Sequence, residues 1–166
     1  PAQAGYKAMM EFRPADAVEP AREAVALAPE SASHRLLLMT ALMLSGRLEE
    51  GVQAATDAIT NDGEDTNALV LRAYMLQRLG RDAGANADYD RALAQDWLDE
   101  QQLHNIRLLA VDAALAAGDA ARANHLLDAM DATDAQVVSR RAAAGKRSLA
   151  RALDATAYPP PLQACR

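Results

Sequence analysis

Few residues of this chain have the types and spacing that chemistry requires. The three histidines, His34, His104 and His125, are far apart in the sequence, whereas a metal site on one helix needs ligands three or four residues apart. The single cysteine, Cys165, has no partner for an internal disulfide, and no nucleophile motif surrounds it. We therefore interpret the histidines as structural or surface residues.

The acidic residues around Gly63 resemble a calcium loop only superficially. Asp62, Glu64 and Asp65 flank this glycine, but their spacing is wrong, and no glutamate stands at the twelfth position, where such a loop has its bidentate ligand. Acidic side chains at the start of a helix explain them better. Because the sequence also has no glycine-rich phosphate loop, we expect no catalytic residue, no metal site and no cofactor, and so no enzyme.

The composition predicts an all-α fold. Hydrophobic residues make up 51% of the 166 residues but aromatic residues only 4%, and alanine and leucine dominate the apolar set. These two residues are strong helix formers, whereas strands favour β-branched and aromatic side chains. The net charge of −6 argues against nucleic acid as a partner, because its phosphates attract clustered lysine and arginine. No apolar run approaches the roughly 18 residues that a membrane span needs.

A repeat of 34 residues organises the predicted helices. Each period is expected to contain a first helix, a turn at a glycine, a second helix and a helix breaker. Small residues early in the second helix would let the two helices of a hairpin approach closely. The columns that keep this interval are Gly46 and Gly80; Ala17, Gly51 and Ala85; Ala24, Ala58 and Ala92; Pro29, Gly63 and Trp97; and Leu42 and Leu76.

These columns resemble the tetratricopeptide repeat, with Phe12 in place of the turn glycine of the first repeat. The resemblance implies a right-handed α-solenoid of about four helical hairpins followed by a capping helix. The expected domain is 1–155, with repeats at about 1–31, 32–65, 66–99 and 100–133, the capping helix at 134–155, and an extended proline-rich tail at 156–166.

The fourth repeat is out of register with the others. Gly118 follows Gly80 by 38 residues, so this repeat carries four extra residues, and Asp99 with Gln102 predicts a capping box at its start. After it, the sequence allows either a capping helix, which we prefer, or a degenerate fifth hairpin broken at Gly145.

In the resembled family, the first helix of each repeat lines a concave groove that binds a partner. An apolar groove suits a partner helix or an extended segment, with tyrosines as anchors, although leucine and methionine at helical spacing are also typical of core. Carried over to this sequence, the groove residues are Tyr6, Met9, Met10, Leu36, Leu37, Thr40, Met43, Val70, Leu71, Tyr74, Gln77, Arg78, Asn105, Leu108, Leu109 and Asp112.

One branch of the family grips the terminal carboxylate of a chaperone with groove lysine, asparagine and arginine side chains. Leucine or valine occupies the matching lysine and asparagine positions here, which excludes that function. We predict instead a non-catalytic scaffold for a protein or peptide partner. The alternative is a purely architectural segment of a longer solenoid. Binding of single-stranded RNA is disfavoured by the acidic charge.

Three segments carry a second resemblance. Residues 5–8, 24–29 and 112–118 are similar to the periplasmic repeats of bacterial outer-membrane phage-adsorption and exopolysaccharide-export proteins. That resemblance implies a periplasmic location and a role in a bacterial envelope or polysaccharide-secretion assembly. The alternative location is the cytoplasm.

Overall fold

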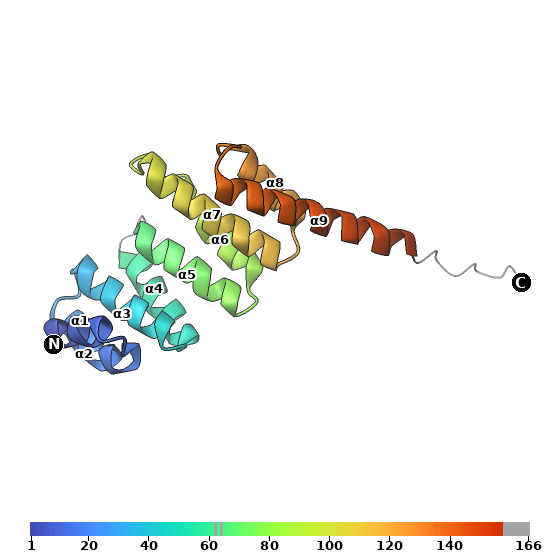
Figure 1. Cartoon of the computed structure of the whole chain (residues 1–166). Helices are drawn as coiled ribbons and strands as arrows, with labels where there is room; N and C mark the ends of the chain where they lie inside the picture. Colours follow the sequence, from blue (N-terminus) through green and yellow to red (C-terminus); the bar gives the residue numbers. More distant parts are fainter. Residues whose placement is uncertain (62, 64, 158–166) are drawn as a thin grey trace, which may run out of the picture. The chain divides into compact units, whose positions relative to one another are not determined.

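The described part of the chain contains nine α-helices and no strand, which confirms the predicted all-α fold (Figure 1). A computed structural model describes residues 1–61, 63 and 65–157, with side chains described through residue 148. Asp62, Glu64, Cys165 and the predicted tail from Tyr158 onward lie outside the described residues. The helices are α1 (Ala2–Met10), α2 (Pro14–Leu27), α3 (Ala32–Leu44), α4 (Leu48–Asn61), α5 (Thr66–Arg78), α6 (Asp82–Leu93), α7 (Glu100–Ala116), α8 (Ala120–Asp128) and α9 (Ala135–Ala157).

Two compact units divide the chain, with the boundary inside α7 between Ile106 and Arg107. Unit 1 contains the three hairpins α1–α2, α3–α4 and α5–α6. Unit 2 begins with the rest of α7 and includes α8 and α9. One continuous array over residues 1–155 therefore stays a prediction.

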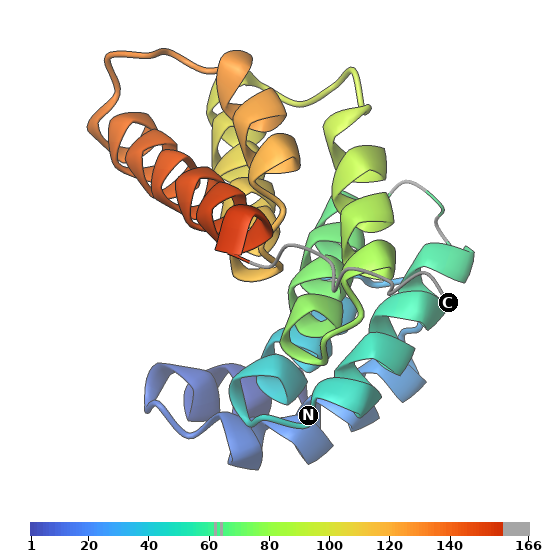
Figure 2. The same cartoon turned by 90° about the vertical axis from the view of Figure 1, so that its right-hand side faces the viewer.

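Within unit 1, the first helices of the hairpins pack side by side, α1 on α3 and α3 on α5 (Figure 2). The second helices behave differently. Each packs on the first helix of the next hairpin, α2 on α3 and α4 on α5. The backbones of α2 and α4 stay apart, and a side-chain hydrogen bond of 3.1 Å from Arg22 to Glu50 spans the space between them. Consequently α3 separates α2 from α4. The helices approach closely because the residues at their contacts are small. These residues, at most 2% exposed, are Ala17, Ala24, Ala58 and Ala92.

Every hairpin closes with the same turn. Gly46, Gly80 and Gly118 have φ angles of 77°, 72° and 77°. The residue after each glycine donates its backbone N–H to a carbonyl five residues earlier, for example Arg47 to Leu42 at 2.9 Å. This geometry satisfies the carbonyls at the end of a helix and needs one residue in the left-handed region. Phe12 takes that place in the first hairpin at φ 55°, the one non-glycine residue with positive φ in the described chain.

Replacing Phe12 with glycine is expected to raise the free energy of unfolding by about 0.5–1 kcal/mol. The left-handed conformation costs an L-residue about 1–2 kcal/mol, and the extra flexibility of glycine in the unfolded chain offsets part of that gain. The side chain is 92% exposed, so little packing is lost. Urea denaturation of both forms measures the difference, and a lower midpoint for Phe12→Gly would mean that the ring stabilises the turn.

The fourth hairpin starts with the predicted capping box, which the structure confirms. Gln102 N–H donates to Asp99 Oδ1 at 2.8 Å, and Asp99 N–H donates to Gln102 Oε1 at 3.0 Å. The helix that follows, α7, has 17 residues against 13 in α3 and α5, so the four extra residues lengthen this helix.

A single long helix, α9, follows the fourth hairpin, and Gly145 does not break it. The preferred capping helix is therefore found, and it extends to Ala157, two residues beyond the predicted end. Within unit 2, α9 is held by Arg141, which donates to Asp128 at 2.9 Å and to the carbonyl of Leu127 at 3.0 Å. The side chains of Val137 and Ala144 are fully buried.

Candidate partner-binding groove

A groove of about 230 Å³ lies between α1 and α3 in unit 1. Tyr6 and Met9 of α1 form one wall. The Tyr6 hydroxyl donates to the backbone carbonyl of Ser33 at 3.2 Å, which ties the ring to the start of α3. The lining residues are Tyr6, Met9, Ser33, Leu36, Leu37 and Thr40, and all except Ser33 were predicted as groove residues from the sequence.

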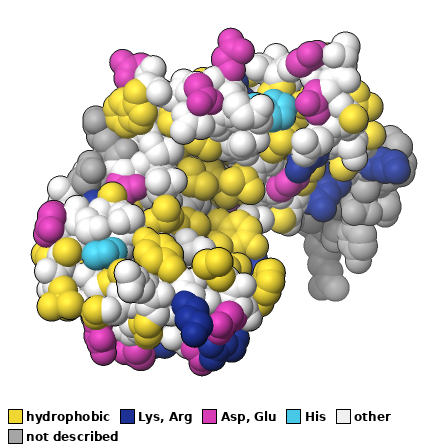
Figure 3. Space-filling view, turned by 60° about the vertical axis from the view of Figure 1, so that its left-hand side comes forward, with side chains coloured by type: hydrophobic (Ala, Val, Ile, Leu, Met, Phe, Trp, Pro, Cys, Tyr) yellow, Lys and Arg dark blue, Asp and Glu magenta, His cyan; other side chains and the backbone are white. Residues whose placement is uncertain are grey.

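This groove is apolar and accessible. No charged side chain lines it, and its polar groups are hydroxyls and backbone. Tyr6 is 41% exposed and Leu36 37% exposed, so both apolar side chains of the lining are accessible to a partner. Figure 3 shows a face of the molecule on which hydrophobic side chains gather, with charged side chains around them. Such a surface can bury apolar side chains of a partner.

The other predicted groove residues of unit 1 lie on the same helices or on α5. Met10 is exposed at the end of α1, and Met43 is half-buried on α3. On α5, Arg78 donates to the Tyr74 hydroxyl at 3.2 Å, and its guanidinium carbon lies 5.9 Å from the centre of the Tyr74 ring. This cation–π contact gives Tyr74 a polar neighbour. Val70, Leu71 and Gln77 are half-buried on the same helix.

The predicted groove residues on α7 that belong to unit 2 have different surroundings. Leu108 is only 7% exposed, so its side chain contributes mainly to packing. Both carboxylate oxygens of Asp112 accept hydrogen bonds from Arg140 of α9 at 2.7 Å, and these bonds raise the pKa of the Arg140 guanidinium. Asp112 thus holds the capping helix. Leu109 is exposed, as is Asn105 at the end of unit 1.

The histidines have structural or surface positions. His34 lies at the start of α3, where its Nδ1–H donates to the carbonyl of Ala24 at 3.1 Å, and His125 is exposed. Across residues 1–61, 63 and 65–157 no three His, Cys, Asp or Glu side chains gather as metal ligands would. Within the same residues, no helix combines the length and the apolar character of a membrane span.

The sequence analysis did not predict an ion pair between half-buried Arg72 and buried Asp88, behind the groove helices. Arg72 of α5 donates two hydrogen bonds of 2.7 Å to the carboxylate of Asp88 on α6 and a third, of 3.1 Å, to the hydroxyl of Thr56 on α4. The hydrogen bonds to Asp88 raise the pKa of the Arg72 guanidinium against the opposing effect of burial. Arg72 and Asp88 thus join three helices of unit 1.

Comparison with solved structures identifies the class of fold. The chain is similar to a tetratricopeptide repeat protein from Parabacteroides merdae, with a TM-score of 0.74 and 16% sequence identity. The match covers 89% of this chain and 59% of that protein, so the chain spans less than two thirds of its length. No family model and no curated protein matches the sequence. The protein therefore has the fold of a tetratricopeptide-type helical repeat, as its 34-residue columns predict.

Proposed function

We propose that this protein is a non-catalytic interaction scaffold that binds a partner segment in the groove between α1 and α3. The observation that carries the proposal is the exposed apolar lining of that groove, above all Tyr6 and Leu36. A protein fold built of stacked hairpins supports it, because such folds bind partners on extended surfaces.

The groove favours a partner segment with an apolar anchor. Its volume of about 230 Å³ suits a large apolar side chain, and Tyr6 offers both ring area and a hydroxyl already anchored to Ser33. An amphipathic helix or an extended segment would place such an anchor between α1 and α3. The exposed part of Tyr74 on α5 would extend the contact along unit 1.

The experiment compares a Leu36→Glu variant with the native chain and with Leu44→Glu. Leu36 lines the groove, whereas Leu44 is exposed at the end of the same helix and does not. Proteins retained from a bacterial envelope extract are identified, and the dissociation constant of the retained partner is then measured with all three forms. We expect Leu36→Glu to weaken binding at least tenfold and Leu44→Glu to leave it unchanged, with equal helix content by circular dichroism. Equal binding by all three forms contradicts the groove assignment.

The proposed setting is a bacterial envelope or polysaccharide-secretion assembly in the periplasm. The support for this is the resemblance of residues 5–8, 24–29 and 112–118 to periplasmic repeats of export and phage-adsorption proteins. Retention of envelope proteins in the experiment above supports this setting, and retention of cytoplasmic proteins alone contradicts it.

The architectural alternative has its own supporting observation. The match covers 59% of the similar protein from Parabacteroides merdae, so in that protein the matched hairpins are a segment of a longer chain. If neither the native chain nor its variants retain a partner, we favour this role for the hairpins.

A further inference from the structure

A second groove opens on the other layer of unit 1, between α2 and α4. It exists because the backbones of α2 and α4 do not pack on each other, so that α3 forms its floor, and the Arg22–Glu50 ion pair crosses it at one end. Its volume is about 390 Å³, and Val25, Leu38 and Ala54 give it an apolar middle. A further pocket of about 470 Å³ adjoins it and shares Pro29, Arg35 and Asn61. The two pockets form one path, with Arg35 where they meet.

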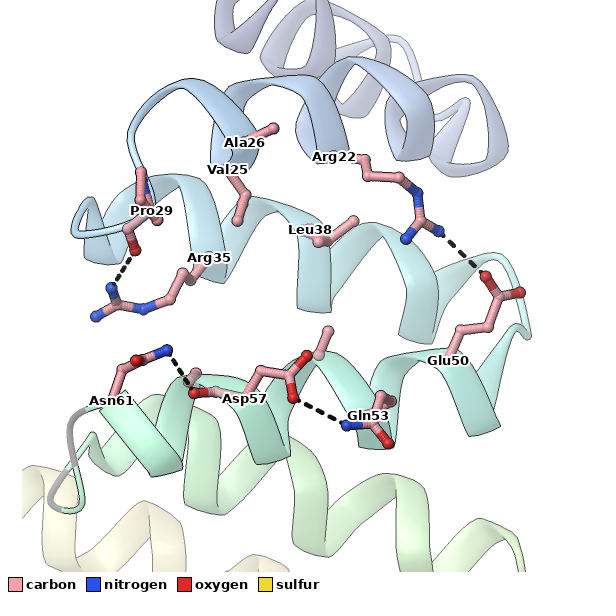
Figure 4. Close-up of a pocket in the computed structure, with 12 residues that line it drawn as sticks. Arg22, Val25, Ala26, Pro29, Arg35, Leu38, Glu50, Gln53, Asp57 and Asn61 are labelled. Atoms are coloured by element: carbon pink, nitrogen blue, oxygen red, sulfur yellow. Dashed lines mark hydrogen bonds and ion pairs between the residues drawn. The ribbon is translucent and has the colours of Figure 1, made fainter.

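Arg35 is a largely buried cation for which the described residues provide no counter-ion. It is 9% exposed, and its one hydrogen-bond partner among the described residues is neutral, the Pro29 carbonyl, to which Nη1 donates at 2.7 Å. Its Nε–H is buried without an acceptor, and no carboxylate of the described residues forms an ion pair with it. Figure 4 shows its guanidinium at the end of the groove, between Pro29 and Asn61. A buried charge needs a partner of opposite sign to be stable.

The helix dipole makes this position still less favourable for a cation. Arg35 is in the first turn of α3, where the partial positive charge at a helix N-terminus favours anions. The fold does not demand an arginine there. The residue 34 positions later is Leu69, which is 1% exposed and occupies the equivalent position of the next hairpin as a core residue.

The repeat also explains why this groove is open. Thirty-four residues after Leu38 and Ala54 come Arg72 and Asp88, whose ion pair fills the matching space between α4 and α6. Between α2 and α4 the corresponding side chains are an aliphatic chain and a methyl group. The first pair of second helices therefore keeps an accessible groove and lacks the buried ion-pair contact that bridges the next pair.

The remaining charges of the groove are separated along its length. At one end Glu50 accepts hydrogen bonds from Arg47 and Arg22, which lower its pKa, so this carboxylate is already paired. In the middle Asp57 accepts a hydrogen bond from Gln53 at 2.9 Å, and Glu30 lines the adjoining pocket. Arg35 alone is a cation without an acidic partner among these groups.

We propose that this groove binds an extended peptide segment in which an acidic side chain pairs with Arg35 and an apolar side chain two residues earlier covers Leu38. Arg35 and Leu38 are three residues apart on α3, so their Cβ atoms are roughly 5–6 Å apart, and alternate side chains of an extended chain, roughly 6.6 Å apart, can reach both. A carboxylate in the groove would accept hydrogen bonds from the accessible part of the Arg35 guanidinium, which lines both pockets, and would neutralise its charge. The site is separate from the α1–α3 groove and does not depend on it.

The test uses the capped peptide Ac-Leu-Ser-Glu-Ser-NH₂ and its glutamine analogue Ac-Leu-Ser-Gln-Ser-NH₂, titrated into the isotope-labelled full chain and followed by NMR. We expect saturable shifts of residues lining the groove with the glutamate peptide and at least tenfold weaker binding of the glutamine peptide. Arg35→Leu copies the residue that the next repeat uses, so it should fold, and it should weaken binding of the glutamate peptide by a similar factor. Asp57→Asn should strengthen that binding, because it removes a like charge from the groove.

Three results would overturn the proposal. The first is equal affinity for the glutamate and glutamine peptides, and the second is unchanged binding to a folded Arg35→Leu variant. The third is tighter binding of a peptide with a free terminal carboxyl group, Ac-Ser-Leu-Ser, because the occupant would then be a chain terminus. The Leu36→Glu variant serves as control: it should bind the glutamate peptide normally, so that this site and the α1–α3 groove are tested separately.

Discussion

Replacing Asp88 with alanine is expected to lower the free energy of unfolding by about 3–5 kcal/mol. The carboxylate is 3% exposed and accepts both hydrogen bonds of the Arg72 fork at 2.7 Å. Without it, Arg72, whose side chain is 18% exposed, remains between α4, α5 and α6 with the Thr56 hydroxyl as its partner among the described residues. The cost is large because the charge stays largely desolvated without its counter-ion, and much of the cost reflects that desolvation and not the strength of the pair itself.

A double variant separates these two contributions. Arg72→Leu with Asp88→Ala reproduces the residues found 34 positions earlier, Leu38 and Ala54, which this fold already accommodates. We expect the double variant to recover most of the stability lost in Asp88→Ala and to lie within about 1–2 kcal/mol of the native chain. Urea denaturation provides the free energies of unfolding when the dependence of the free energy on urea concentration is fitted for each variant. A double variant as unstable as Asp88→Ala alone would mean that the ion pair itself, and not the unpaired charge, determines the loss.

The hairpins could be predicted because backbone geometry restricts which residues fit at their turns and contacts. Gly46 and Gly80 stand at turns that need positive φ, and Ala58 and Ala92 stand where two helices touch. Both requirements act on single positions and repeat at the interval of the hairpin, so they are visible in one sequence. Phe12 shows the limit, since the same turn forms there with a residue that disfavours its conformation.

The polar interior could not be predicted, because it depends on which side chains meet across helices. Arg72 and Asp88 are 16 residues apart and have no spacing that distinguishes them from surface charges. Arg35 likewise looks like a solvated arginine until the fold buries it. The repeat did contain a signal, because an arginine at position 35 corresponds to a leucine at 69, and a charge in a column that elsewhere holds a core residue merits a structural explanation.

The candidate groove was accessible to sequence reasoning only through the resemblance to a known repeat. Tyr6, Met9, Leu36, Leu37 and Thr40 lie together in one groove, which spacing along two separate helices does not establish by itself. Their role in binding stays a prediction. The surroundings of Asp112 could not be foreseen, since Arg140, its partner, comes from a helix 28 residues later.

The close contact of α4 with α5 yields the second large effect. A Cβ atom at Gly51 would overlap the sulfur of Met75, lie 3.2 Å from its Cε atom and lie 3.5 Å from Leu42 Cβ. Met75 is fully buried, so its side chain has little room to move away. Replacing Gly51 with valine is therefore expected to lower the free energy of unfolding by about 2–3 kcal/mol. The cost of overpacking is larger than the gain of about a few tenths of a kcal/mol from the higher helix propensity of valine.

The matched control is Gly145→Val in α9, where a Cβ would meet no atom within 4 Å. This variant should leave stability unchanged or raise it slightly, which separates the effect of the contact from that of the residue type. Met75→Ala makes the space that the valine needs, and alone it should cost about 2–5 kcal/mol by leaving a cavity. If Gly51 and Met75 compete for one volume, the loss in the double variant will be smaller than the sum of the two single losses by at least about 1 kcal/mol. Additive losses would place the strain of Gly51→Val elsewhere than at Met75.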